Sequence, residues 1–220
     1  MARGIFVTGT DTGVGKTVVA TALLRALAAS GQRAAGMKPV SAGYSAGGSV
    51  NPDVVALCDA GNVDAPLSDR NPFAFAPAIA PHLAAAEAGV CIDLGLIAAA
   101  YGRLSARADV VVVEGAGGVL VPIDATRDML DIASRLSLPV LLVVGMRLGC
   151  LNHALLSAAA IRARGLRLAG WVANFVDPQM RAGKANVDAL SLRLPAPLLA
   201  EVAWGTPPAF LPEVLDRLGE

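Results

Sequence analysis

The sequence predicts an α/β protein built as one domain over residues 1–220, with a mostly parallel sheet and helices on both faces. Five short apolar runs, without polar alternation, have the form of strands buried on both sides. They cover residues 5–8, 34–40, 110–113, 139–145 and 168–174. Helical patterns lie between these runs, and strands that alternate with helices indicate βαβ crossovers.

Four helices are expected, and three of the four have a signal at one end. They cover residues 16–30, 51–61, 93–107 and 152–164. Gly31 and Gly165 follow the first and the last, where glycine closes a helix in the left-handed conformation. Asn51 and Pro52 suit the N-cap and first position of the second helix. The segments 41–49 and 177–184 are expected to be mobile surface loops.

Composition excludes several classes of partner. The chain has 18 basic and 18 acidic residues, so it lacks the positive excess expected of a nucleic-acid or membrane-surface binder. No run of about 18 apolar residues is present, and the apolar start is too short for a secretory signal. Cys58, Cys91 and Cys150 form no C-x-x-C pair, which favours reduced core thiols. We expect small-molecule partners and a cytoplasmic location.

A phosphate-binding loop is expected directly after the first strand. The segment TGTDTGVGKT ends in residues 13–17 and leads into a helix, the context in which glycines and a helix N-terminus surround phosphate. Strict motif spacing would place the first glycine at Thr10, whereas Gly9 comes one residue earlier. Three of the 18 basic residues are lysines, so a lysine at position 16 fits a need for a compact ammonium. The competing interpretation is a glycine-rich turn with a solvated lysine.

Further charged residues follow predicted strands or open a helix. Lys38 ends the second apolar run, where it could face a phosphate or simply lie in water at a sheet edge. Glu114 follows four valines, where a P-loop protein keeps the carboxylate that positions Mg²⁺, although it could also pair with a helix. Asp53 lies in a first helical turn, which favours an acid whatever else it does. His82 and His153 fit no two-histidine metal spacing.

Taken together in their order, several segments resemble those of the dethiobiotin synthetase family. They are GTDTGVGKT, MKPV, NPD, VVVVEGAGG, LPVLLVVGMRLGCLNHALL, GWVANFV and PAPLLAEV, between about Ile5 and Trp204. The resemblance implies a P-loop NTPase-like fold and an ATP-dependent ligase of biotin biosynthesis. Such an enzyme carboxylates 7,8-diaminopelargonic acid with CO₂ and closes the ring to dethiobiotin, with Mg²⁺ as cofactor. It also implies a homodimer with the substrate site at the subunit interface.

The resemblance implies a role for each matched residue. The catalytic residues would be Lys16, Lys38 and Thr12. The Mg²⁺ ligands would be Thr17, Asp53 and Glu114. The ATP-binding residues would be Gly13, Val14, Gly15, Lys16, Thr17, Val18, Asp53, Glu114, Gly115, Ala116, Gly117, Asn174, Ala203, Trp204 and Gly205. The substrate would be held by Thr12, Lys38, Ser41, Gly149, Cys150, Leu151 and Asn152, of which the last four come from the helix N-terminus of the partner subunit. Asn174 would read the adenine edge.

Two positions depart from the family pattern. In the family, a Ser or Thr usually lies four residues after the lysine of the KPV motif. Here this position is Ala42, and the preceding residue is Ser41. Either the loop shifts or that substrate hydrogen bond is lost. Asn186 falls where a tyrosine helps to hold the substrate carboxylate. The sequence alone does not specify how tightly the substrate is held at these two positions.

Two other classes of protein carry a similar phosphate-binding loop. An amide-forming ligase of the cobyric acid type carries a similar loop but normally has a separate glutaminase domain, for which this chain is too short. A partitioning-type ATPase that dimerises on DNA would carry a further lysine near residues 9–12 and a basic surface. The sequence shows neither feature.

Overall fold

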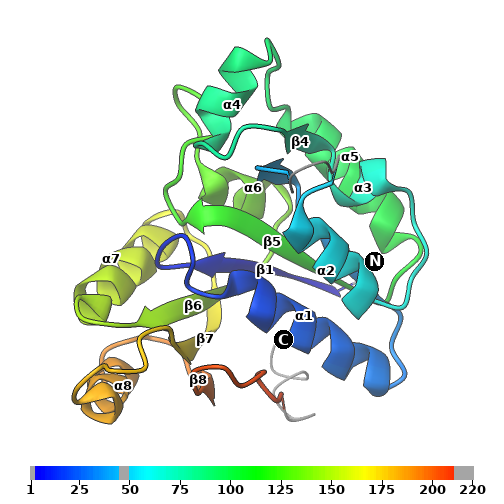
Figure 1. The fold of residues 1–220 in the computed structure, drawn as a ribbon. Coiled ribbons are helices and arrows are strands. Elements are labelled where there is room, and N and C mark those ends of the chain that lie inside the picture. Colours follow the sequence, from blue (N-terminus) through cyan, green and yellow to red (C-terminus); the bar gives the residue numbers. More distant parts are fainter. Residues whose placement is uncertain (1–2, 45–49, 211–220) are drawn as a thin grey trace.

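A computed structural model describes residues 3–44 and 50–210, and its centre is a six-stranded sheet (Figure 1). The strand order is β2-β5-β1-β6-β7-β8, and every pairing in it is parallel. The strands are β1 Arg3–Gly9, β2 Ala34–Met37, β5 Val110–Gly118, β6 Val140–Met146, β7 Leu168–Phe175 and β8 Leu198–Val202. A second, two-stranded parallel sheet pairs β3 Val40–Ala42 with β4 Phe73–Phe75.

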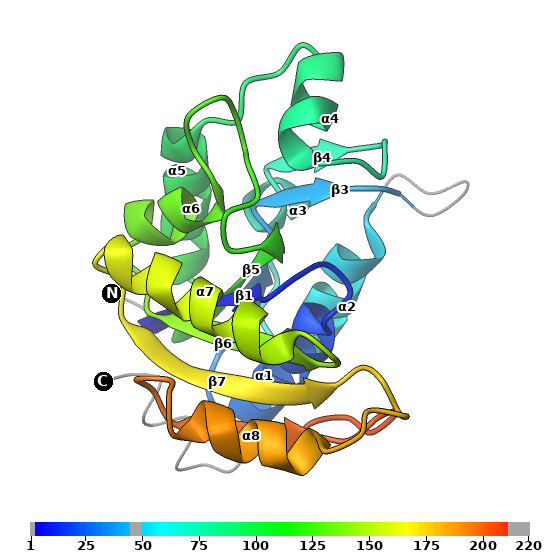
Figure 2. The same ribbon diagram turned by 90° about the vertical axis from the view of Figure 1, so that its left-hand side faces the viewer.

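Helices cover both faces of the large sheet, because its central strands send alternate side chains to opposite sides (Figure 2). Ile5 and Val7 of β1 pack with α1 and α2, whereas Phe6 packs with the cluster around α5, α6 and α7. The helices are α1 Lys16–Ala29, α2 Pro52–Ala60, α3 Leu67–Arg70, α4 Pro81–Glu87, α5 Leu94–Ser105, α6 Met129–Arg135, α7 Cys150–Ala163 and α8 Gly183–Ser191. The predicted α/β class is confirmed.

All five predicted strands are present, with some changes at their ends. The run 34–40 is divided, because Pro39 has no N–H to donate to a ladder, so β2 ends at Met37 and β3 begins at Val40. The run 110–113 extends to Gly118, which places Glu114 inside a strand and not after it. Neither β4 nor β8 was predicted.

Helix boundaries and one loop differ from expectation. Helix α7 begins at Cys150 after Gly149, two residues before the predicted start, and α5 ends at Ser105. The expected loop 41–49 begins with strand residues, since Ser41 and Ala42 belong to β3, and residues 45–49 lie outside the described part. The expected loop 177–184 ends where α8 begins, at Gly183.

Three predicted turn signals are confirmed. The side chain of Asn51 accepts a hydrogen bond from the amide of Asp53 and caps α2, with Pro52 in the first position. Gly31 and Gly165 follow α1 and α7 with φ of 85° and 68°. Among the described residues, no helix combines the length and the apolar character that a membrane crossing requires.

Candidate active site

The loop between β1 and α1 has the shape of a phosphate cradle. Gly13 and Gly15 have φ of 74° and 88°, a conformation that side-chain-bearing residues rarely adopt. Between them, Val14 is buried in a notch formed by two other glycines. A Cβ at Gly9 would lie 2.5 Å from Val14 Cγ2, and one at Gly145 would lie 2.6 Å from Val14 Cγ1. The early glycine of this loop is therefore needed for packing Val14.

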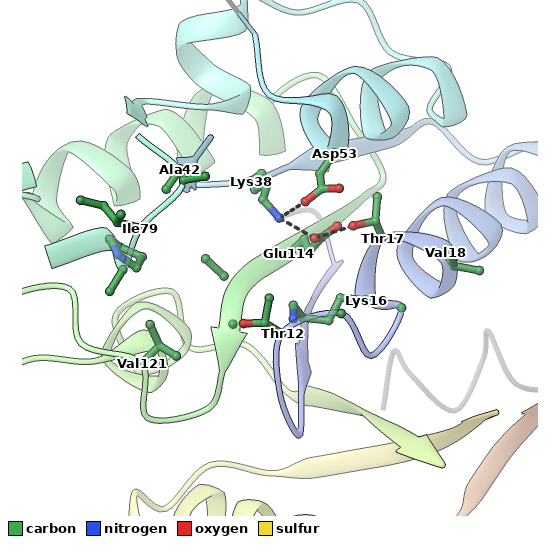
Figure 3. Close-up of a pocket in the computed structure, with 17 residues that line it drawn as sticks. Thr12, Lys16, Thr17, Val18, Lys38, Ala42, Asp53, Ile79, Glu114 and Val121 are labelled. Atoms are coloured by element: carbon green, nitrogen blue, oxygen red, sulfur yellow. Dashed lines mark hydrogen bonds and ion pairs between the residues drawn. The ribbon is translucent and has the colours of Figure 1, made fainter. Parts of the chain in front are cut away.

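A cluster of charges lies beside this loop (Figure 3). The ammonium of Lys38 lies 2.5 Å from Glu114 Oε1 and 2.9 Å from Asp53 Oδ2. The hydroxyl of Thr17 donates to the same Glu114 oxygen at 2.9 Å. Residues from β5, α1, α2 and the end of β2 thus meet at one point, at the carboxyl edge of the sheet, where ligands bind in folds of this kind.

The strand register explains how Lys38 reaches Glu114. Met37, the last residue of β2, is aligned with Val113 of β5. Lys38 directly follows Met37 and Glu114 directly follows Val113, so the two charged residues come side by side. Val7 of β1, just before the loop, is aligned with Glu114 from the other side. Strands β2, β5 and β1, which lead to Lys38, Glu114 and the loop with Lys16, are therefore neighbours in the sheet.

The two buried lysines have opposite pKa shifts. Burial alone would lower the pKa of Lys38, but the carboxylates of Glu114 and Asp53 raise it above its ordinary value. Lys16 donates to the carbonyl of Asp11 at 2.9 Å, and burial together with the nearby charge of Lys38 lowers its pKa to about 8. Lys38 thus stays charged. Lys16, in contrast, has no carboxylate in contact among the described residues, so its surroundings stabilise its charge only weakly.

The two acids also differ. Burial raises the pKa of Glu114 above its ordinary value, against the opposing effect of Lys38. Asp53 is more exposed, and although its partial burial opposes ionisation, Lys38 and Thr17 lower its pKa. The two carboxylates and the ammonium therefore form one strongly coupled group.

The donor set fits a small divalent cation that also takes oxygen ligands from phosphate or water. Glu114 Oε2 is buried and has no hydrogen-bond partner among residues 3–44 and 50–210, so an acceptor is available there. A carboxylate from Asp53 and the hydroxyl of Thr17 lie beside it. Within the same described ranges, no group of three or more His, Cys, Asp or Glu side chains could hold a metal by itself. The set suits Mg²⁺, which keeps few protein ligands.

A cavity of about 770 Å³ opens over this cluster. Eleven of the 22 residues expected at the site line it, namely Thr12, Gly13, Gly15, Lys16, Thr17, Val18, Lys38, Asp53, Glu114, Ala116 and Gly117. Its other walls come from Ala42 and Val121, and from residues 78–81 at the start of α4. Sequence reasoning missed residues 78–81 and Val121, because apolar residues in a loop carry no chemical signal.

The other eleven expected residues do not line this cavity, among them Ser41, Val14 and Gly115. The hydroxyl of Ser41 is fully buried and donates to Asn71 Oδ1 at 2.9 Å, so it points away from the cavity. Ser41 therefore does not line the cavity in this structure, whereas Ala42 does. Val14 is the anchor beneath the loop, and Gly115 lies against the ring of Phe6, where a Cβ would come within 3.0 Å.

Asn174 holds the phosphate-binding loop. Its amide donates to the carbonyl of Val14 at 2.8 Å, and a Cβ at Gly15 would lie 2.1 Å from the same nitrogen. It is aligned with Val202, the last residue of β8, so Ala203–Gly205 continue from that edge with Trp204 exposed. The expected adenine contacts thus lie at one edge of the sheet, and adenine reading by Asn174 remains a prediction.

The N-terminus of α7 lies outside the cavity lining. Gly149 has φ of 94° and precedes the helix that begins with Cys150 and includes Leu151 and Asn152. These residues are predicted to contribute to the site of a second copy, and that role stays a prediction. Asn186, the other departure from the family pattern, is half-buried in α8.

Comparison with solved structures finds similar folds in several proteins. A MinC:MinD cell division protein complex from Aquifex aeolicus matches with a TM-score of 0.59 and 16% identity, over 99% of this chain and 86% of that chain. The MinD of Pyrococcus horikoshii complexed with Mg-ADP gives 0.56 at 17% identity, over 92% and 82%. The signal recognition particle receptor FtsY of Elizabethkingia anophelis gives 0.57 at 18% identity, over 100% and 66%. At these identities the likeness establishes the fold alone.

Sequence comparison gives the family. A family model described as an AAA domain matches residues 3–207. A protein of Nitrosospira multiformis named ATP-dependent dethiobiotin synthetase BioD is 55% identical over 90% of this chain and 87% of its own length. Proteins of the same name from Aromatoleum aromaticum and Xanthomonas oryzae are 52% and 50% identical, over 91% and 90% of this chain and 90% of each relative. The chain therefore belongs to the ATP-dependent dethiobiotin synthetase family.

Proposed function

We propose that this chain, as one domain, catalyses the ATP-dependent synthesis of dethiobiotin from 7,8-diaminopelargonic acid and CO₂, a step of biotin biosynthesis. The observation that carries this proposal is the Lys38–Glu114–Asp53 cluster beside the loop lysine, inside a cavity, in a chain of this family. A P-loop alone would indicate only a nucleotide. The buried second lysine adds a cation where a phosphoryl group would be transferred.

The proposed reaction consists of an addition to CO₂ followed by two displacements. One amine of the diamine adds to CO₂ and loses a proton, which gives a carbamate. A carbamate oxygen attacks the γ-phosphorus of ATP, ADP leaves, and a carbamic-phosphoric anhydride forms. The second amine then attacks the carbonyl carbon, loses a proton and displaces inorganic phosphate, which closes the ring.

The first displacement brings two anions together, so it needs fixed positive charge. Lys16 lies at the helix N-terminus, where it would bind the outer phosphates, and Lys38 lines the same cavity. Because its carboxylate neighbours keep Lys38 protonated, it would face the carbamate and the transferring phosphoryl group as a cation. Thr12, which also lines the cavity, would donate a hydrogen bond to the carbamate.

Magnesium would be held by Thr17, Asp53 and Glu114. When bound, it would supply further positive charge to the phosphate oxygens. The free oxygen of Glu114 and the partly exposed carboxylate of Asp53 support this assignment. The glycines of the loop and Gly117 leave room for phosphate oxygens at the backbone, since no Cβ occupies the space.

The far carboxylate of the substrate would bind at the N-terminus of α7 in the partner subunit of a homodimer. Backbone amides at the start of a helix favour an anion. Leu148, beside Gly149, is 94% exposed, as expected of an apolar residue that a partner covers. Replacing Leu148 with Arg should shift the sedimentation coefficient towards the monomer. A monomeric parent protein would contradict the dimer. Neither nucleic acid nor membrane is a proposed partner, and the cytoplasm is the proposed location.

The first experiment measures phosphate release from MgATP and bicarbonate, with and without the diamine, while the organic product is followed by mass. Release that depends on the diamine and matches dethiobiotin one for one supports the proposal. The chain offers a matched control, because Lys184 is an exposed lysine on α8. Lys38→Gln should lose turnover, whereas Lys184→Gln should keep it. Equal phosphate release without the diamine would overturn the proposal.

A further inference from the structure

Lys38 lies between two strands, and its main chain is held by a buried segment about 33 residues away in sequence. The amide of Lys38 donates to the carbonyl of Arg70 at 2.8 Å. The side-chain amide of Asn71 donates to the carbonyl of Lys38 at 2.6 Å and to that of Phe73 at 3.2 Å. Both peptide groups of Lys38 are therefore fixed from the same side.

This support replaces the sheet ladder that ends at this point. Strand β2 stops at Met37, and Pro39 has no N–H of its own. Strand pairing resumes at β3, where Val40 is aligned with Phe73 of β4. The amide of Phe73 also donates to the carbonyl of Pro39. Lys38 is thus at a junction of two sheets, where a buried carbonyl without a partner would be costly.

Ser41 belongs to the same network. Its hydroxyl donates to the side-chain oxygen of Asn71, which leaves the nitrogen of Asn71 facing Lys38 and Phe73. Asn71 is 7% exposed and Ser41 is fully buried, so both hydrogen bonds are shielded from water. A shielded side-chain network holds a single geometry more strictly than an exposed one.

We propose that Asn71 is a positioning residue for Lys38, and that Ser41 acts by orienting Asn71 and does not touch the substrate. This inference rests on the proposed role of Lys38 in phosphoryl transfer. Asn71 lies outside the cavity lining, so it reaches the reaction only through the main chain of Lys38. The junction sets where the ammonium stands between Glu114 and Asp53.

The test is the kinetics of Asn71→Ala. A misplacement of about 1 Å at a catalytic group can lower the rate about 100-fold. We expect kcat to fall at least tenfold, with the KM for ATP and for the diamine within about threefold of the parent. A merely structural role would instead lower the fraction of active enzyme, which active-site titration corrects for.

The chain supplies a matched control at the other end of the same strand. The side chain of Asn62 makes two hydrogen bonds to the main chain there. It accepts one from the amide of Ala34 at 2.7 Å and donates one to the carbonyl of Gln32 at 2.9 Å. Asn62→Ala likewise removes two hydrogen bonds to the main chain, but at the start of β2, from an exposed residue that does not line the cavity. Its kcat should remain within twofold of the parent, although both variants should unfold at lower urea concentration.

Ser41→Ala gives a second route if Asn71→Ala does not fold. If Ser41 orients Asn71, kcat should fall several-fold with an unchanged KM for the diamine, and its effect should be smaller in the Asn71→Ala background than in the parent. A raised KM for the diamine with unchanged kcat would overturn the inference and restore a substrate contact. An unchanged kcat in Asn71→Ala would also overturn it.

Lys38→Gln, measured in parallel, separates this inference from the function on which it rests. If Lys38→Gln loses turnover while Asn71→Ala keeps it, only the positioning role fails. If Lys38→Gln keeps turnover, the proposed role of Lys38 fails, and the positioning role fails with it.

Discussion

Replacing Lys16 with Met should stabilise the fold while it removes ATP binding. Lys16 is only 7% exposed, its ammonium donates to one carbonyl, and the charge of Lys38 lies nearby. The difference between its ordinary pKa of 10.5 and its pKa of about 8 corresponds to about 3 kcal/mol, at about 1.4 kcal/mol per pH unit. Methionine has a similar length and no charge. We therefore expect the free energy of unfolding to rise by about 2 to 3 kcal/mol at pH 7.

The sign of this effect fixes its pH dependence. A base whose pKa is lower in the folded than in the unfolded state destabilises the fold while it is charged in both, here below about pH 8. The penalty shrinks as the pH rises from about 8 to 10.5, and only above this range is the lysine neutral in both states. The advantage of Lys16→Met should therefore shrink across this window.

Urea unfolding between pH 7 and pH 10.5, in protein free of ATP and Mg²⁺, measures the effect. Lys184→Met is the control, because Lys184 is exposed and its removal should change the free energy of unfolding by no more than about 0.5 kcal/mol. Calorimetry with ATP should find no binding to Lys16→Met. A variant less stable than the parent at pH 7, or equally stabilised at pH 10.5, would refute the reasoning.

Three further predictions concern the loop and its surroundings. Asn174→Ala removes the hydrogen bond to Val14, so the affinity for ATP should fall about fivefold for about 1 kcal/mol; a larger loss for ATP than for GTP would indicate that Asn174 also reads adenine, whereas an equal loss would indicate that it only supports the loop. Gly145→Ala should lower ATP affinity at least tenfold, because the new Cβ would displace Val14, whereas Gly102→Ala, with open space around it, should bind ATP normally. Glu114→Gln should raise the Mg²⁺ concentration that gives half-maximal turnover by at least tenfold, measured at saturating ATP; an unchanged Mg²⁺ requirement would remove Glu114 from the ligand set.

The sequence was most informative where chemistry and local pattern coincide. The glycines, the lysine and the following helix predicted the phosphate-binding loop, and the apolar runs predicted the five strands. The meeting of Lys38 with Glu114 depends on the order of strands in the sheet, which composition and spacing do not specify. It follows only from β2 and β5 being adjacent with Met37 beside Val113.

Ser41 shows why neighbouring positions are easily confused. In a strand, successive side chains point to opposite faces, so Ala42 faces the cavity whereas Ser41 points into the protein. The hydroxyl at Ser41 looked like a displaced substrate contact because the segment was predicted as a loop. Its partner, Asn71, is 30 residues away, and no local signal predicts such a contact.

Lys16 and Lys38 are residues of the same type in the same cavity, but we expect them to have different functions. Lys16 and Lys38 are 7% and 4% exposed, yet their pKa values shift in opposite directions, because only Lys38 has carboxylate partners. Lys16, whose charge is poorly satisfied, gains most from an incoming phosphate, which makes it the stronger contributor to ATP binding. Lys38 is already compensated, so a ground-state phosphate gains less from it. Its charge is better suited to negative charge that develops between ATP and carbamate, which is why its loss should lower turnover more than affinity.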